Sequence, residues 1–318
     1  MTIKNKSVVI IGSGLMANEY CSALSKIGIS DVELIGRSQK SLERICKKFN
    51  FKSINQDYAD AIKLLSKKDL IIIATPIPDL IIAAKLALKY GQTNILIEKP
   101  GSLYYNQLLA LNKIKKSQKI FVAYNRLFYP NLQKLFQLVK KDGGITSCNF
   151  TFTERVHKID FKKYHQSVYS RWGIANSLHV ISMALRIIGM PKKITCIQSG
   201  KLPWHKSGSI FVGCGISKNG IPFSYNADWS SPGRWGIEVT TKKNAYRLIP
   251  LEQLYQCSRN STNWIPIKFD KKYLNVKEGI SEEILAMLTP NQNNLPNLVS
   301  LKEASEFNKV SEKIFGYS

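Results

Sequence analysis

The sequence predicts an α/β protein in two parts, a parallel, doubly wound sheet followed by an α+β domain with an open, largely antiparallel sheet. Apolar runs alternate with amphipathic stretches over the first ~120 residues, which is typical of successive βα units. Short β-rich runs cluster after Phe128. The length of 318 residues suits two domains, at about 150 residues per domain.

In the first part, apolar runs of four to six residues read as strands, the first of them suited to burial on both faces. We expect strands at residues 7–11, 31–35, 69–74, 94–97 and 120–123. Helical periodicity predicts helices at 15–27, 38–49, 79–90 and 104–116. Ser38 is placed to cap the second of these helices.

The second part predicts several strands around one apolar helix. Strands are expected at 145–153, 193–199, 209–216, 221–228, 235–241 and 246–249. Helices are expected at 131–141, 174–188, 280–288 and 301–315. The change from alternating strands and helices to clustered strands predicts a first domain at residues 1–123, a second at 124–290 and a C-terminal segment at 291–318.

Composition narrows the function. The 46 basic and 22 acidic residues give a net charge of +24, which favours anionic ligands. Mutational bias toward AT-rich codons is an alternative source of the lysine excess. The lysines are dispersed and form no basic block, so we expect solvated lysines and no nucleic-acid partner.

Apolar stretches and cysteines indicate the cellular location of the protein and whether it binds a metal. No apolar stretch approaches the ~20 residues that cross a bilayer, and we expect a cytoplasmic protein without a membrane partner. The six cysteines are scattered without a C-x-x-C pair, so we expect free thiols and no metal site.

A glycine motif follows the first strand. Gly12-Ser13-Gly14-Leu15-Met16-Ala17 matches G-x-G-x-x-(G/A) and opens a helix. Gly12 permits a tight turn, and Gly14 lets the backbone approach a pyrophosphate at the helix N-terminus. In this context the motif predicts a dinucleotide site that includes Leu15 and Met16.

The tip of the second strand bears on which dinucleotide binds. It reads Gly36-Arg37-Ser38 and lacks the carboxylate that would hold the ribose 2′-hydroxyl of NAD. The guanidinium of Arg37 and the hydroxyl of Ser38 are suited to a 2′-phosphate. Ser38 also serves as a helix cap, and both roles stay open. The tip therefore favours NADP, with NAD as the alternative.

Three further motifs follow later strands: Ala74-Thr75-Pro76, Glu98-Lys99-Pro100, and Tyr124-Asn125-Arg126 with Phe128 and Pro130 beyond it. With these motifs nearly the whole chain resembles the Gfo/Idh/MocA family (glucose–fructose oxidoreductase and inositol dehydrogenase). The resemblance implies an N-terminal Rossmann domain, with the C-terminal segment packed back on it.

The resemblance also implies roles for the matching residues. Ala74, Thr75, Pro76, Glu98, Lys99 and Asn125 would lie along the cofactor. Lys99 would touch the reacting hydroxyl or carbonyl, and Arg126 would bind substrate. A lysine at a strand end can stabilise a developing alkoxide.

The family's second signature is a helical Asp, a Gly two residues later, a His four residues after the Asp, and a further Asp. His179 matches, whereas Ala175, Ser177 and Ser182 replace the other three positions. The resemblance implies a catalytic His179 that shares one site with Lys99, and a substrate-binding Asn176. A lone histidine on an apolar helix is also a common core residue. Arg234, in the turn at 233–236, is a further substrate-binding candidate, with an ordinary exposed turn as the alternative.

These observations predict an oxidoreductase that transfers a hydride between a nicotinamide and a secondary alcohol or ketone of a sugar-like or nucleotide-sugar substrate. The missing carboxylate at Ala175 motivates a second hypothesis, a non-catalytic sensor on the same fold. The resemblance further implies a homo-oligomer that associates through the exposed face of the second sheet.

Overall fold

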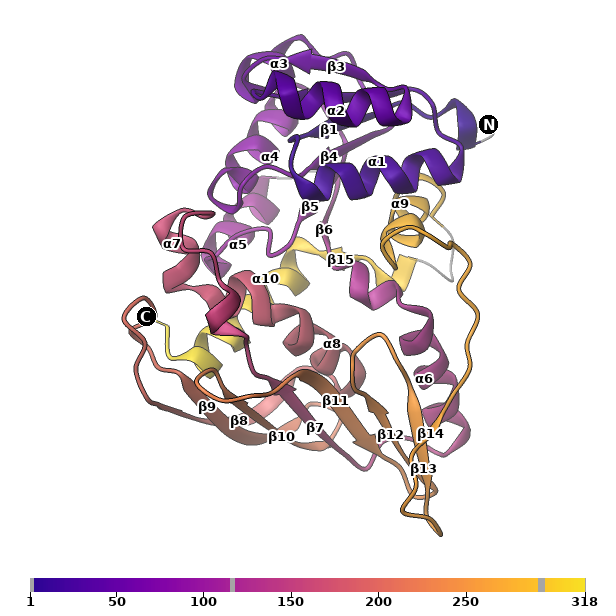
Figure 1. Ribbon diagram of the computed structural model, residues 1–318, viewed down its shortest axis with the longest axis vertical. Helices are drawn as coiled ribbons and strands as arrows, with labels where there is room; N and C mark the ends of the chain where they lie inside the picture. Colours follow the sequence, from indigo (N-terminus) through magenta and orange to yellow (C-terminus); the bar gives the residue numbers. More distant parts are fainter. Residues whose placement is uncertain (1–2, 115–117, 291–294, 318) are drawn as a thin grey trace. The chain divides into compact units, whose positions relative to one another are not determined.

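The computed structural model describes residues 3–114, 118–290 and 295–317, and the chain forms two compact units (Figure 1). One unit runs to Phe128 and also contains Lys272–Glu306. The other contains Tyr129–Lys271 and the residues from Phe307 onward. These boundaries differ from the expected ones. Residues 272–290 belong to the first unit instead of the second, and 307–317 belong to the second instead of the first.

The first unit is built on a seven-stranded sheet in the order β15-β6-β5-β4-β1-β2-β3. Its strands are β1 (Val8–Ile11), β2 (Val32–Gly36), β3 (Lys52–Asn55), β4 (Leu70–Ile73), β5 (Asn94–Glu98), β6 (Lys119–Ala123) and β15 (Val299–Ser300). All neighbours are parallel except β15, which runs antiparallel to β6. The predicted doubly wound parallel sheet is therefore confirmed. β3 escaped prediction because it is a largely exposed edge strand whose residues form no apolar run.

The helices of this unit are α1 (Leu15–Ile27), α2 (Gln39–Phe49), α3 (Tyr58–Leu64), α4 (Leu80–Lys89), α5 (Tyr105–Ile114) and α9 (Ile280–Leu288). Gly28 ends α1 in the left-handed conformation, where its N–H caps the carbonyl of Leu24. Residues 115 and 116, expected at the end of a helix, lie outside the described residues.

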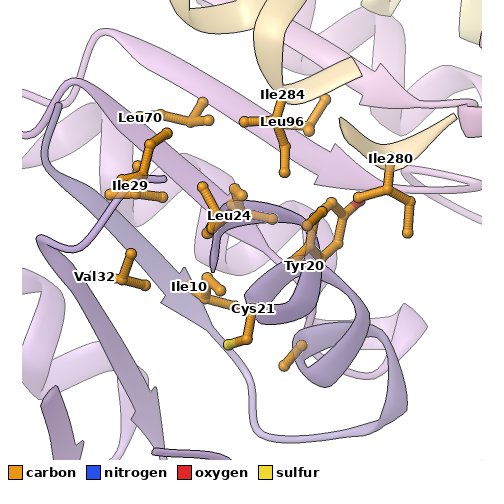
Figure 2. Packing of buried hydrophobic residues seen from close by; sticks show 14 of the residues in the cluster. Ile10, Tyr20, Cys21, Leu24, Ile29, Val32, Leu70, Leu96, Ile280 and Ile284 are labelled. Carbon is orange, nitrogen blue, oxygen red and sulfur yellow. The ribbon is translucent and has the colours of Figure 1, made fainter. Parts of the chain in front are cut away.

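The core of the first unit explains why residues 272–290 belong to it. Tyr20, Cys21 and Leu24 of α1 are wholly buried, and Ile280 and Ile284 of α9 join the same cluster (Figure 2). Apolar side chains on one face of α9 must be covered, and α1 supplies the surface that covers them. A helix far along the chain thereby completes the first unit.

The second unit holds an eight-stranded sheet in the order β14-β13-β12-β11-β7-β10-β9-β8. Its strands are β7 (Ser147–Phe152), β8 (Pro191–Ser199), β9 (Ile210–Ser217), β10 (Pro222–Asp228), β11 (Trp235–Thr240), β12 (Asn244–Leu248), β13 (Tyr255–Ser258) and β14 (Ile265–Pro266). The β7–β10 pair is parallel and the other neighbours are antiparallel. The predicted open, largely antiparallel sheet is confirmed.

The remaining helices are α6 (Pro130–Lys141), α7 (Gln166–Ser170), α8 (Leu178–Ile188) and α10 (Leu301–Phe315). α8 packs against β7 and β11. The helix expected to begin at residue 174 instead begins with a π-helical turn, Gly173–Ser177. A Cβ at Gly173 would lie 2.3 Å from Cε2 of Phe315, so only glycine permits this close approach.

The C-terminal residues from Phe307 onward belong to the second unit through aromatic packing. Phe315 is wholly buried and its ring packs edge-on against Phe152 and Phe211 of the sheet. The hydroxyl of Tyr317 accepts from the N–H of Gly173 at 3.0 Å. Residues 291–294 of the expected C-terminal segment lie outside the described residues. In the part of the chain that is described, no helix is long and apolar enough to cross a membrane.

Candidate functional site

The glycine motif forms a tight turn between β1 and α1. Gly12 has a φ of +127°, and a Cβ there would lie 2.4 Å from the carbonyl oxygen of Ala74. Gly14 precedes α1 without a side-chain cap, and no described atom lies within 4 Å of where its Cβ would be. The backbone at Gly14 is therefore open to the close approach of a ligand, and the first N–H groups of a helix, which have no partners within it, suit an anion.

Leu15 and Met16 occupy the first turn of α1. Leu15 is 69% exposed, whereas Met16 is partly buried. Nζ of Lys277, a residue that the sequence analysis did not single out, lies 3.2 Å from Sδ of Met16. This ammonium adds a positive charge beside the helix N-terminus, where the helix dipole already favours an anion.

The tip of β2 presents Arg37 to solvent. Oγ of Ser38 accepts from the N–H of Ser41 at 3.3 Å and lies 3.0 Å from Oγ of Ser41. Ser38 is thus the N-cap of α2, one of the two roles that the sequence left open. Arg37 remains as the charged donor at this tip.

Three predicted cofactor residues follow neighbouring strands of the parallel sheet. Thr75, Lys99 and Asn125 come after β4, β5 and β6, which lie side by side, so all three emerge at the carboxyl edge of the sheet. Pro76 lies at the same edge as Thr75, and Arg126 is the half-buried neighbour of Asn125.

The structure assigns a packing role to Asn125. Its Nδ2 donates to the carbonyl of Glu278 at 2.9 Å and anchors the segment that leads into α9. Oγ1 of Thr75 is buried without a hydrogen-bond partner among the described residues. A buried hydroxyl without a partner costs free energy, so a ligand that supplied one would be favoured.

Glu98 lies in a buried acidic cluster. One of its oxygens accepts from the hydroxyl of Tyr20 at 2.7 Å. Burial raises the pKa of Glu98, although the Tyr20 hydrogen bond and the charges of Lys99 and Lys277 oppose the shift. Burial, then the charge of Glu98, raises the pKa of Glu283 well above its ordinary value. Glu283 was missed, although a glutamate on the apolar face of a predicted helix is a signal that could have revealed it.

The second unit contains a cavity of about 520 Å³. Its lining includes three aromatic residues (Tyr164, Trp172 and Trp235), four cations (Arg155, Lys158, Lys163 and Arg234) and three acids (Glu154, Asp160 and Glu252). Asn176 also lines it, so the cavity brings together two predicted substrate-binding residues, Asn176 and Arg234. A cavity that combines aromatic walls with polar groups able to orient a ligand is a candidate small-molecule site.

Glu154 is the main residue of this cavity that sequence reasoning missed. It follows β7, is only 6% exposed, and accepts from Nδ2 of Asn176 at 2.8 Å and Oγ of Ser177 at 2.5 Å. No motif marks it, because its partners are more than 20 residues away along the chain. Glu154 thus brings a carboxylate to Asn176 and Ser177 from the end of β7.

His179 is half-buried beside the cavity wall. It does not line the cavity, but its ring lies 5.9 Å from that of Trp235, which does. Lys99 belongs to the first unit and His179 to the second. That they share one site stays a prediction.

Two further histidines have structural roles. His205 is wholly buried between the carbonyl of Gly208 and the hydroxyl of Tyr317, and burial lowers its pKa. His165 caps α7. The six cysteines are free thiols. Within residues 3–114, 118–290 and 295–317, no group of three or more His, Cys, Asp or Glu is arranged to hold a metal ion.

Comparisons with known proteins bear on the fold of the chain. The model of the shikimate/quinate 5-dehydrogenase family matches residues 1–95. The comparison with curated proteins yields no match.

Solved structures match almost the whole chain. A protein described as an NADPH-dependent oxidoreductase from Desulfitobacterium hafniense is 14% identical, with a TM-score of 0.79 over 98% of this chain and 94% of that one. UDP-N-acetylglucosamine 3-dehydrogenase from Acidithiobacillus ferrooxidans is 14% identical, with a TM-score of 0.71 over 97% and 96%. Levoglucosan dehydrogenase, solved with NADH, is 15% identical, with a TM-score of 0.75 over 97% and 95%.

The chain has the fold of these oxidoreductases. The resemblance to the Gfo/Idh/MocA proteins that the motifs indicated is therefore confirmed at the level of the fold. At 14–15% identity the similarity extends no further than the fold.

Proposed function

We propose that the protein is an NAD(P)-dependent oxidoreductase acting on a secondary alcohol or ketone of a sugar-like substrate. The observation that carries the proposal is the open N-terminus of α1 behind Gly12 and Gly14, which suits a dinucleotide pyrophosphate. Arg37 and the missing ribose carboxylate favour NADP over NAD. The bound nicotinamide supplies the hydride acceptor or donor, and the chain's own residues hold the substrate and move its proton.

The cavity of the second unit supports a sugar-like substrate. Indole and phenol rings pack on the apolar faces of a sugar, while Asn176 and Glu154 offer polar partners for hydroxyl groups. Arg155, Lys158 and Arg234 favour a substrate that also carries negative charge, such as a nucleotide-linked sugar. One of the similar structures, UDP-N-acetylglucosamine 3-dehydrogenase, is named for a nucleotide-linked sugar.

Lys99 and His179 are the proposed catalytic residues. The ammonium of Lys99 stabilises negative charge on the reacting oxygen, and the imidazole of His179 takes or gives its proton. We further propose that the protein is a homo-oligomer, in which a second copy covers the exposed face of the second sheet.

A sensor that binds dinucleotide and sugar without catalysis is the second candidate. It is favoured by Ala175, which supplies no carboxylate four residues before His179.

The two functions are separated by incubating the protein with NADP⁺ or NADPH and sugars that include UDP-N-acetylglucosamine and levoglucosan. Absorbance at the nicotinamide band follows turnover, and calorimetry follows cofactor binding. Turnover supports the oxidoreductase. Tight binding of cofactor and sugar without turnover would favour the sensor. The absence of cofactor binding would contradict both proposed functions.

A further inference from the structure

Glu154 is held in the cavity wall by two consecutive residues. The Nδ2 of Asn176 donates to one carboxylate oxygen and the Oγ of Ser177 donates to the other. Both donors belong to the π-helical turn Gly173–Ser177. On an α-helix consecutive side chains diverge by about 100°, so they rarely reach one group. The wider turn brings both donors to the same carboxylate, and such turns are frequent at functional sites.

The positions at which the chain departs from the helical signature also support this arrangement. Ser177 is one of the positions at which the chain departs from the helical signature, and its hydroxyl is a donor to Glu154. Ala175 is 4% exposed and has no polar side chain to offer the cavity. At this helix the carboxylate therefore comes from the end of β7, and a residue at one of the departing positions, Ser177, holds it.

Burial makes the position of this carboxylate costly. A carboxyl group withdrawn from water needs hydrogen-bond donors, and Asn176 and Ser177 supply two of them. Each of its oxygens offers two acceptor sites, and the group lines the 520 Å³ cavity together with Trp172 and Trp235. A ligand in the cavity would meet a fixed acceptor on one side and the cations Arg155 and Arg234 elsewhere in the wall.

We propose that Glu154 is the substrate-binding carboxylate of this cavity, where it accepts hydrogen bonds from hydroxyl groups of the sugar. The inference rests on the proposed function, and it names the ligand class more closely. The substrate presents hydroxyl donors to Glu154 and an anionic group to the cations. Asn176 and Ser177 are positioning residues that orient the carboxylate.

The alternative is that Glu154 only ties β7 to the π-helical turn. The two roles predict different effects of a substitution on the binding of different ligands. A purely structural carboxylate affects all ligands of the cavity alike, whereas a contacting one is coupled to one hydroxyl group of the ligand.

The test uses the protein loaded with NADPH, and UDP-N-acetylglucosamine together with its 3-, 4- and 6-deoxy analogues as probes. Trp172 and Trp235 line the cavity, so their fluorescence reports binding. Glu154→Gln should weaken binding of UDP-N-acetylglucosamine by about 10–100-fold, as expected for a hydrogen bond to a charged group. For one deoxy analogue, which lacks the contacting hydroxyl, the same substitution should change binding less than threefold.

Matched variants test whether weaker binding comes from a lost contact with the ligand, and not from a lost charge or from misfolding. Glu252→Gln removes a negative charge from the same cavity and should have a much smaller effect. Glu154→Asp keeps the acid but retracts it, and should give an intermediate loss if Glu154→Gln fails to fold. Ser177→Gly should weaken binding less than tenfold, with thermal unfolding reported for each variant.

Equal losses for the parent sugar and every deoxy analogue, or no loss at all, would overturn the role of Glu154 while leaving the oxidoreductase proposal intact. Normal NADPH binding with no response to any hydroxylated probe would overturn the substrate assignment, including Glu154. Failure to bind NADPH would instead remove the proposed function itself.

Discussion

At the scale of single residues, Arg37 is the side chain that we expect to discriminate between NADP and NAD. Its guanidinium stands exposed at the tip of β2, where the 2′-substituent of a bound adenosine ribose is expected. Ser38 beside it is engaged in capping α2, which leaves most of the discrimination to Arg37.

Arg37→Ala should therefore weaken NADPH binding by about tenfold and leave NADH binding unchanged, because only NADPH carries a 2′-phosphate for a charge-assisted hydrogen bond. Dissociation constants from calorimetry check this. Arg44→Ala, on the exposed face of α2, is the matched control. Wild-type protein that binds NADH as tightly as NADPH would contradict the preference.

Lys99 and His179 are expected to act on the bound substrate and not on cofactor affinity. Lys99→Met and His179→Ala should each lower kcat by roughly 10²–10⁴-fold, with NADPH affinity nearly unchanged. Because Ala175 gives the imidazole no carboxylate partner, the Lys99 variant should lose more. Steady-state kinetics measure this, with the exposed residues Lys89→Met and His157→Ala as controls. Full turnover by either site variant would remove that residue from the mechanism.

At the scale of elements, α9 brings an acid into the first unit. Packing of α9 on α1 buries Glu283 near Glu98, and the backbone N–H of Tyr124 is the group that favours its charged form. Tyr20 donates to Glu98 from α1. Helix packing thus confines two carboxyl groups that would repel each other if both were ionised.

This arrangement makes stability depend on pH in a definite direction. The pKa of Glu283 is raised in the folded state, so both states are protonated below the unfolded value of about 4.3. As pH rises above it, the unfolded chain loses the proton first, and stability falls until the folded pKa is passed.

Glu283→Gln should therefore raise Tm at pH 7.5 and change it little near pH 4. Each kcal/mol of relieved penalty is worth about 2–4 °C. Calorimetric scans across this pH range measure the effect, with the exposed Glu43→Gln as control. An equal shift of Tm at both pH values would show that packing, and not ionisation, causes it.

For the whole molecule, the exposed face of the second sheet bears on assembly. Ile197 and Val212 are directly paired across β8 and β9, and they are 60% and 38% exposed. Neighbouring apolar side chains on an open sheet are favourable to cover, which supports the proposed association of two copies.

The wild-type protein should sediment as an oligomer, and the double variant Ile197→Lys with Val212→Lys as a monomer of unchanged fold. Like charges facing each other across such an interface would be costly to bury. Ile265→Lys, at an exposed position on β14, controls for the added charge. Monomeric wild-type protein in sedimentation velocity would refute the association.

Local sequence patterns were enough to predict much of the secondary structure of this protein. Apolar runs of strand length and helical periodicity predicted most elements of both sheets, and the glycine motif predicted the turn that Gly12 makes against Ala74. These features depend on residues close together in the chain. Elements without a local signal, such as the polar edge strand β3, escaped prediction.

Only the tertiary structure decided which distant groups meet. Glu154 reaches Asn176 and Ser177, Tyr20 reaches Glu98, and α9 joins the first unit, although no motif links any of these partners. Such contacts follow from the way apolar faces cover one another and buried polar groups find donors, which depends on the packing of whole elements. Periodicity along a sequence records which face of an element is apolar, but the partner of that face is chosen by the folded chain.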